Sequence, residues 1–259
     1  MNPIGQPGRP RMIAFYVLAG LMTVAAAVEM VNHLIDDSIS PHHIHSLAHA
    51  LVEIAVLVAL GSQLWRPAQH VVGIQQLLVI ALASAVADAL SFRFGGLEVI
   101  LFVFVAVLAP LHPARRELLH LGGVRVRTLA FAGLACVPLV IFALGQAGLQ
   151  RAGFEPAHAD PGHWSWMVGL ALVIGLLAVL AAIVPSGRRI PGYTAAALMV
   201  AFGVGSLIFA AEPSAVPTIW ALVGIVGSLA FIAVMEADHG GSSARRVPLD
   251  GVQAESAKL

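Results

Sequence analysis

The stretch HHIHSLAHALVEIAVLVALGSQLW, residues 42–65, joins a histidine-rich segment directly to an apolar run. A helix needs about 20 predominantly apolar residues to cross a hydrocarbon core of about 30 Å. Runs of suitable length recur at 12–33, 44–64, 70–91, 96–112, 128–149, 164–185, 191–211 and 217–236. The sequence therefore predicts an all-α integral membrane protein, built as a bundle of about eight transmembrane helices.

The composition supports the same class of protein. Hydrophobic residues make up 59% of the chain and charged residues 11%, whereas soluble domains are about half apolar and a quarter charged. The single cysteine, Cys136, lies in an apolar run, which excludes an internal disulfide framework and a CxxC metal site. The expected partners are the lipid bilayer and a metal ion. Nothing favours nucleic acid, and the sequence indicates no particular protein partner.

The orientation follows from lysine and arginine, which accumulate in cytoplasmic loops. If both termini are cytoplasmic, all the basic residues lie inside except Arg93 and Arg151. This topology fits the plasma (inner) membrane of a bacterium. The predicted segments are a cytoplasmic N-terminus (1–11), a first four-helix half (12–112), a basic cytoplasmic loop (113–127), a second four-helix half (128–236) and a polar, disordered cytoplasmic tail (237–259).

The two halves align with each other. A shift of about 120 residues places Pro41 over Pro161 and His43 over His163. Because each half has an even number of helices, the halves would share one orientation, as parallel repeats. The outer loops 34–43 and 150–163 would then be equivalent, and both carry histidines and acids.

Polar residues form a stripe on the second predicted helix. At about 100° per residue, His42, His45, His49 and Glu53 fall within a sector of roughly 80°. Glu53 would lie roughly 16 Å below His42, near the bilayer midplane. A carboxylate at that depth is unfavourable against lipid, so this face is expected to point into the bundle.

Other polar residues are expected at the same outer level. Glu29 and His33 share a face of the first helix, Asp88 lies near the outer end of the third, and the outer loop adds His158 and His163. Imidazole and carboxylate are ligands of zinc, iron and copper. We therefore predict a transition-metal site with the candidate ligands Glu29, His33, His45, His49, Asp88, His158 and His163. Glu53 would act as a catalytic base or orient a ligating imidazole.

Several functions fit this pattern. The leading hypothesis is a metalloenzyme that acts on a lipidic or small apolar substrate. The alternatives are a transporter of a divalent metal or of protons, and a haem protein with two axial histidines, for example His49 and His163. A metal-free, proton-binding network is the simpler interpretation of the same residues. Trp164, Trp166 and Trp220 fit an interfacial aromatic belt.

Two segments carry a resemblance to known proteins. APLHPARRELL (109–119) and AHADPGHWSWM (157–167) resemble segments of uncharacterised polytopic membrane proteins of high-GC bacteria, which have an HPxRR inner loop and a GHW outer loop. This resemblance implies a class of protein and no particular activity. His45, His49, Ser46 and Asp88 are also similar in residue type to the zinc site of the adiponectin-receptor and ceramidase hydrolases, although the late HxxxH motif of that group is missing.

Overall fold

The computed structural model describes residues 8–35, 43–93 and 97–244. Every regular element in these residues is a helix. The elements are α1 (Arg9–Ile35), α2 (His43–Trp65), α3 (Val71–Ser91), α4 (Leu97–Leu111), the 3-10 turn η2 (Arg115–Glu117), α5 (Val126–Arg151), α6 (Pro156–Ala159), α7 (His163–Ile183), α8 (Arg189–Ile208) and α9 (Thr218–Ala244).

Seven of the described helices are long and apolar enough to cross a membrane: α1, α2, α3, α5, α7, α8 and α9. The remaining predicted run, 96–112, forms the shorter helix α4, whose apolar part covers Val99–Leu111. The predicted class, an all-α multi-pass membrane protein, is therefore confirmed. By length, the described residues supply seven spans and one shorter apolar helix.

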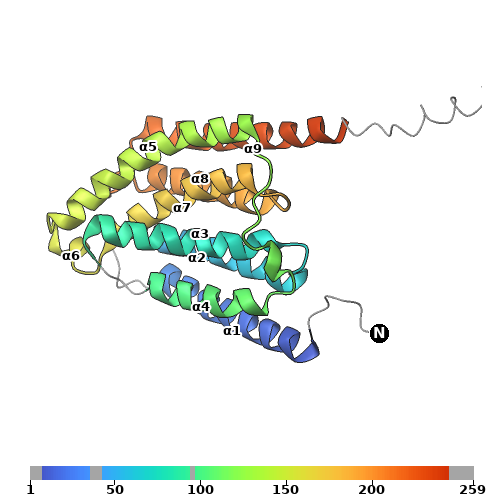
Figure 1. The fold of residues 1–259 in the computed structure, drawn as a ribbon. Helices are drawn as coiled ribbons and strands as arrows, with labels where there is room; N and C mark the ends of the chain where they lie inside the picture. Colours follow the sequence, from blue (N-terminus) through green and yellow to red (C-terminus); the bar gives the residue numbers. More distant parts are fainter. Residues whose placement is uncertain (1–7, 36–42, 94–96, 245–259) are drawn as a thin grey trace, which may run out of the picture.

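The helices are stacked in four layers of two (Figure 1). The inner layers are α2 with α3 and α7 with α8, and the outer layers are α1 with α4 and α5 with α9. Most residues of the inner helices are buried, whereas only about a fifth of the residues in the spans of α1, α5 and α9 are buried. Because the exposed side chains of these outer helices are largely apolar, they suit contact with lipid.

The packing of the second half follows that of the first. In the first half α1 packs on α2, α2 on α3, α3 on α4, and α1 on α4. In the second half α5 packs on α7, α7 on α8, α8 on α9, and α5 on α9. This order agrees with the alignment of the two halves in sequence, and descent from one repeated unit stays a prediction.

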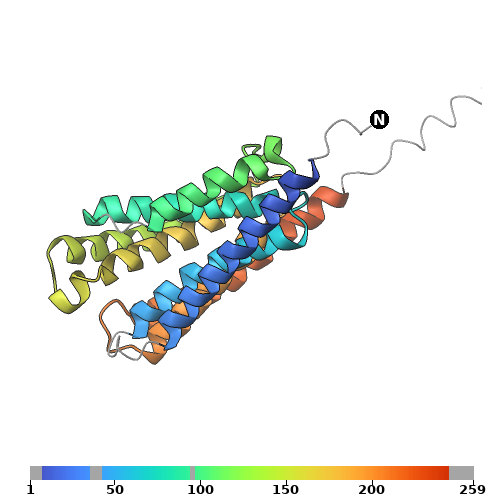
Figure 2. The same ribbon diagram turned by 90° about the horizontal axis from the view of Figure 1, so that it is seen from below.

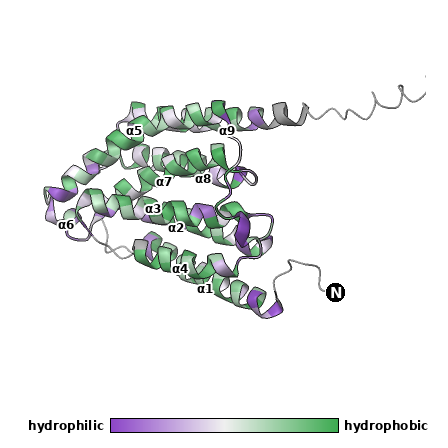
Figure 3. Ribbon diagram, viewed as in Figure 1, coloured by the Kyte–Doolittle hydropathy of each residue, from purple (hydrophilic) through white to green (hydrophobic). Residues whose placement is uncertain are grey.

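The polar residues gather at the two ends of the bundle (Figure 3). We call the end with the connections α1–α2, α3–α4, α5–α7 and α8–α9 the histidine end, and the opposite end the arginine end. Helix α1 begins and helix α9 ends at the arginine end (Figures 1 and 2). Arg93 and Arg151 are the arginines of the histidine end, and all other described arginines lie at the arginine end.

The C-terminal helix is longer than the sequence indicates. Helix α9 continues to Ala244, although the predicted disordered tail begins at 237. The extension is held by neighbouring helices. Asp238 accepts hydrogen bonds from the backbone N and Oγ1 of Thr128 at the start of α5, and Glu236 pairs with Arg189 at the start of α8. Residues 245–259 of the predicted tail lie outside the described residues.

Candidate functional site

Five imidazole rings follow one another at the histidine end. They are His33 of α1, His45 and His49 of α2, His158 of α6 and His163 of α7. Their ring centroids lie 4.4 Å apart for His33 and His49, 6.3 Å for His49 and His163, 5.1 Å for His163 and His45, and 5.0 Å for His45 and His158. We call this group the histidine chain.

Regular helix geometry places the two histidines of α2. His45 and His49 are four residues apart, so they share one face of the helix, as the sequence predicts. That face is turned into the bundle, because His45 is fully buried and His49 is 9% exposed. The Nδ1 of His49 has no hydrogen-bond partner among the described residues, and its ring packs against Trp166 with centroids 3.8 Å apart.

The connection between α5 and α7 places the rings of His158 and His163. His158 lies in α6, a single turn with Pro156 at its start, and His163 is the first residue of α7. Arg93 holds the segment between them, because its Nη1 donates to the carbonyls of Ala159 (3.3 Å) and Asp160 (2.7 Å). Gly162 has φ +86°, and a Cβ there would lie 2.5 Å from the Arg93 guanidinium. Glycine is therefore required where the chain turns into α7.

A carboxylate contacts the ring at each end of the histidine chain. Glu53 Oε1 lies 2.8 Å from His33 Nδ1, and Glu155 Oε2 lies 3.1 Å from His158 Nδ1. Because an ionised carboxylate only accepts hydrogen bonds, Nδ1 of a neutral His33 carries the proton and Nε2 has the lone pair. The other oxygen of Glu53, Oε2, is buried without a hydrogen-bond partner among the described residues.

The partner of Glu53 also fixes its level in the bundle. His33 lies in the last turn of α1, which ends at Ile35. Glu53 therefore lies close to the level at which α1 ends, and it is also near the middle of α2. Its predicted depth at the bilayer midplane stays a prediction.

His45 is held by a hydroxyl group from a distant connection. Ser214 Oγ donates to Gln146 Oε1 (2.7 Å) and lies 3.1 Å from His45 Nε2. The only hydroxyl hydrogen is used on Gln146, so Ser214 must accept from His45. Neutral His45 therefore carries its proton on Nε2. Ser214 has the left-handed φ of 73°, a strained backbone for a residue other than glycine.

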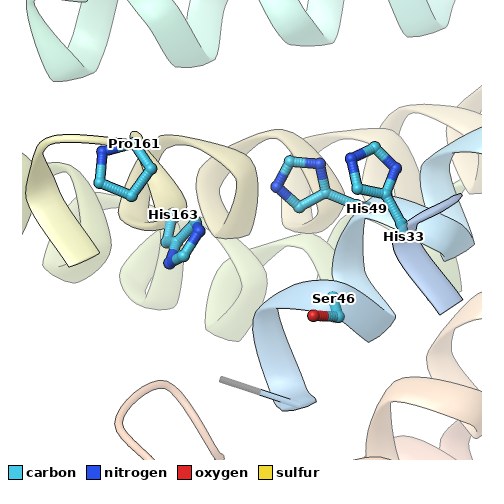
Figure 4. A pocket seen from close by; sticks show the side chains of 5 residues that line it. All are labelled: His33, Ser46, His49, Pro161 and His163. Atoms are coloured by element: carbon cyan, nitrogen blue, oxygen red, sulfur yellow. The ribbon is translucent and has the colours of Figure 1, made fainter. Parts of the chain in front are cut away.

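A cavity of about 200 Å³ lies beside the histidine chain and is lined by His33, Ser46, His49, Pro161 and His163 (Figure 4). His33 and His49 lie side by side, and His163 is on the other side of the cavity (Figure 4). The cavity thus adjoins the longest step between neighbouring rings, from His49 to His163.

Two tryptophans contact the histidine rings directly. Trp164 is fully buried, stacks on His158 with centroids 5.1 Å apart, and donates its indole N–H to the Phe154 carbonyl. Trp166 packs on His49. The sequence predicts an interfacial belt for these residues. The composition of the segment gives no sign of the contact, which depends on how α2 and α7 meet.

Glu212, in the α8–α9 connection, binds the first turn of α2. Its Oε2 accepts the Ile44 backbone N–H (2.8 Å) and its Oε1 lies 2.7 Å from His43 Nδ1. A carboxylate at this position satisfies a free N–H group of the helix start and interacts favourably with the helix dipole. Sequence reasoning missed Glu212, Ser214 and Gln146, because their partners are far away along the chain.

The predicted site residues are only partly brought together. His33, His45, His49, His158, His163 and Glu53 form one group, whereas Glu29 is exposed and has no hydrogen bond or ion pair with a described residue. Asp88 accepts a hydrogen bond from Ser165 Oγ (3.0 Å) and borders the group through α7. His42 lies outside the described residues. Within the described ranges, no set of three or more His, Cys, Asp or Glu side chains is arranged to hold a metal ion.

Fold and site together give the architecture of a multi-pass α-helical membrane protein with a chain of histidines at one end. No protein-family model, no curated protein and no solved structure matches the chain. The function must therefore be argued from the site.

Proposed function

We propose that the histidine chain carries protons between the outer membrane–water interface and Glu53, as the proton-binding part of a proton-coupled membrane transporter. The observation that carries this proposal is the succession of five imidazoles with a carboxylate at each end. Imidazole accepts a proton on one nitrogen and releases one from the other near neutral pH. The basic residues at the arginine end favour placing the histidine end outside.

The spacing of the rings suits proton transfer. Two imidazoles joined by an N–H···N hydrogen bond of about 2.9 Å have centroids about 5 Å apart. Three of the four steps lie near or below this separation. The longest step, 6.3 Å, adjoins the cavity of about 200 Å³, whose lining includes three histidines and Ser46. Such a cavity has polar partners and room for water. His45 and His163 are stacked at 21°, so transfer between them requires one ring to rotate.

Glu53 is the expected end of the proton path. An intramembrane carboxylate marks a functional site by default. Beyond it, the nearby glutamines are occupied by structural contacts, because Gln75 donates to the carbonyl of Leu118 and Gln76 to that of Ala55. We therefore expect that Glu53 is protonated and deprotonated reversibly, and that protons are not conducted freely through the whole bundle.

The test follows the protonation of Glu53 in the full chain by infrared difference spectroscopy during a pH step. Wild type should show a protonated-carboxyl band that the Glu53→Gln variant lacks. His49→Phe keeps a planar ring but cannot carry a proton, so it should slow the appearance of the band at least tenfold. The matched control is His120→Phe, because His120 is exposed at the arginine end. A wild-type rate in His49→Phe would refute the relay.

Transition-metal binding is the second candidate, and one observation favours it. The centroids of His45, His158 and His163 form a triangle with sides of 5.0, 5.1 and 5.9 Å. Imidazoles around one tetrahedral ion, with metal–nitrogen distances of about 2.0–2.1 Å, have centroids about 5 Å apart. Metal-binding histidines also usually donate their second N–H, as His45 does to Ser214. The described rings would have to rotate to share one ion.

A metalloenzyme with Glu53 as base depends on that ion, as does metal transport. Haem binding by His49 and His163 has less support, because the adjoining cavity of about 200 Å³ is smaller than usual ligand pockets of about 300–1,000 Å³. Elemental analysis and a visible spectrum of the purified protein separate these candidates. The relay predicts a colourless protein without stoichiometric zinc, iron or copper. One bound metal per chain, lost in His45→Ala/His163→Ala, would favour the metal site instead.

A further inference from the structure

A buried arginine lies at the arginine end, remote from the histidine chain. Arg188, in the connection between α7 and α8, is only 5% exposed. The Nη2 atom of its guanidinium is fully buried and has no hydrogen-bond acceptor among the described residues. A buried guanidinium without a hydrogen-bonded acceptor is unfavourable, so a further anion would stabilise this site.

The nearest charged groups do not supply that anion. Glu236 is bound by Arg189 and Tyr193, and Asp238 accepts hydrogen bonds from Thr128. Burial lowers the pKa of Arg188, and the nearby Arg125 lowers it further, although Glu236 and Asp238 act in the opposite direction. Arg125 also donates from Nη1 to the Val184 carbonyl (2.8 Å). The arginines Arg125, Arg188 and Arg189 thus face only two carboxylates, which leaves a net positive group.

The surroundings suit a phosphate group. Gly187 has the left-handed φ of +69° and leads directly into α8, whose N-terminus carries a partial positive charge. Ser186 and Arg189 are exposed, so the group is open to the surface at its edge. Arginine binds phosphate oxygens with two parallel N–H groups, a geometry that lysine lacks.

We propose that Arg125 and Arg188, at the starts of α5 and α8, bind the phosphate group of an anionic phospholipid. Both residues lie at the ends of apolar helices, where lipid headgroups would be. Basic pockets between membrane helices are common sites for such headgroups. The usual role of loop arginines in setting topology requires only exposed charges, so it does not explain why Arg188 is buried.

The test compares lipid binding to the full-length protein by native mass spectrometry in detergent. Wild type should bind phosphatidylglycerol at least tenfold more tightly than phosphatidylcholine. Arg188→Gln and Arg125→Gln should each abolish this preference. The matched control is Arg116→Gln, because Arg116 is an exposed arginine of the same end, and its preference should stay within twofold of wild type.

Two controls keep the outcome decisive. Thermal unfolding identifies a variant that fails to fold, and Arg125→Gln then carries the test if Arg188→Gln does not fold. Unchanged lipid preference in the folded variants would overturn the proposal. So would inorganic phosphate that displaces phosphatidylglycerol and binds equally well alone, because the site would then recognise free phosphate. Neither result depends on the histidine chain.

Discussion

The proton position on His45 depends on one side chain, that of Ser214. Ser214 uses its hydrogen on Gln146, so His45 donates from Nε2 and keeps its lone pair on Nδ1. In either proposed function Nδ1 is the reactive atom, because its lone pair would accept a proton in the relay or bind the ion in the metal site. The role proposed for His45 thus depends on Ser214, a residue outside the histidine chain.

We expect Ser214→Gly to abolish the preferred tautomer of His45. Glycine tolerates the φ of 73° at this position, so the variant removes the hydroxyl without adding backbone strain. The nitrogen chemical shifts of His45 in solid-state NMR should change from the Nε2–H form to a mixture. The free energy of unfolding should fall by about 1–3 kcal/mol, because the variant removes both hydrogen bonds of the hydroxyl. Unchanged shifts of His45 would show that Ser214 does not set the tautomer.

The start of α2 is held in place by the α8–α9 connection. Glu212 accepts the Ile44 N–H and contacts His43, whose ring also stacks on Phe209 with centroids 4.8 Å apart. The same connection supplies Ser214 to His45, the third residue of α2. One loop therefore fixes both the position of α2 and the tautomer of its first buried histidine.

The Glu212→Ala variant should loosen the first turn of α2. Loss of a capping carboxylate typically costs about 0.5–2 kcal/mol, and the cost should appear locally. We expect faster amide hydrogen exchange at Ile44 and little change near Trp65, at the other end of the helix. Glu117→Ala, an exposed acid of the arginine end, is the matched control. Equal exchange at Ile44 in both variants would argue against the cap.

Sequence reasoning succeeds where the signal is local to one element. The apolar runs predict the helices, and the four-residue spacing predicts the shared face of His45 and His49. It fails where the partner lies on another helix. By sequence alone, Glu29 is as suitable a metal ligand as His33. In the structure Glu29 is exposed, whereas His33 contacts Glu53. Which face of α1 turns inward is decided by its packing on α2 and α4, which no short motif records.

The two ends of the bundle differ in chemistry, because histidines gather at one end and most arginines at the other. The arginine end is held by a network that joins the first, second and fourth helices. His112, just beyond α4, has its Nε2 3.0 Å from Gln63 Oε1, its Nδ1 accepts the Ala114 N–H, and its ring contacts Phe15 edge to face. Arg11 donates to the His112 carbonyl. His112 is fully buried, so this network requires a neutral imidazole.

Acid should therefore destabilise the whole bundle through His112. Burial lowers the pKa of His112 to about 4 in the folded protein, helped by the Arg11 charge and opposed by hydrogen bonds to the backbone, whereas an unfolded histidine has a pKa of about 6.5. The unfolded state then binds the extra proton first. The stabilisation is complete above pH 6.5 and decreases by about 1 kcal/mol per pH unit as the pH falls toward 4.

Thermal unfolding in detergent between pH 7.5 and 4.5 measures this effect. Other histidines also titrate, so the decisive quantity is the difference in slope between wild type and His112→Asn, which keeps an acceptor for the Ala114 N–H but cannot titrate. The wild type should lose more stability than the variant over this range, by a few kcal/mol at most. The exposed-histidine variant His120→Asn should retain the wild-type slope. Parallel slopes for wild type and His112→Asn would mean that acid acts elsewhere, with the histidine end as the next region to test.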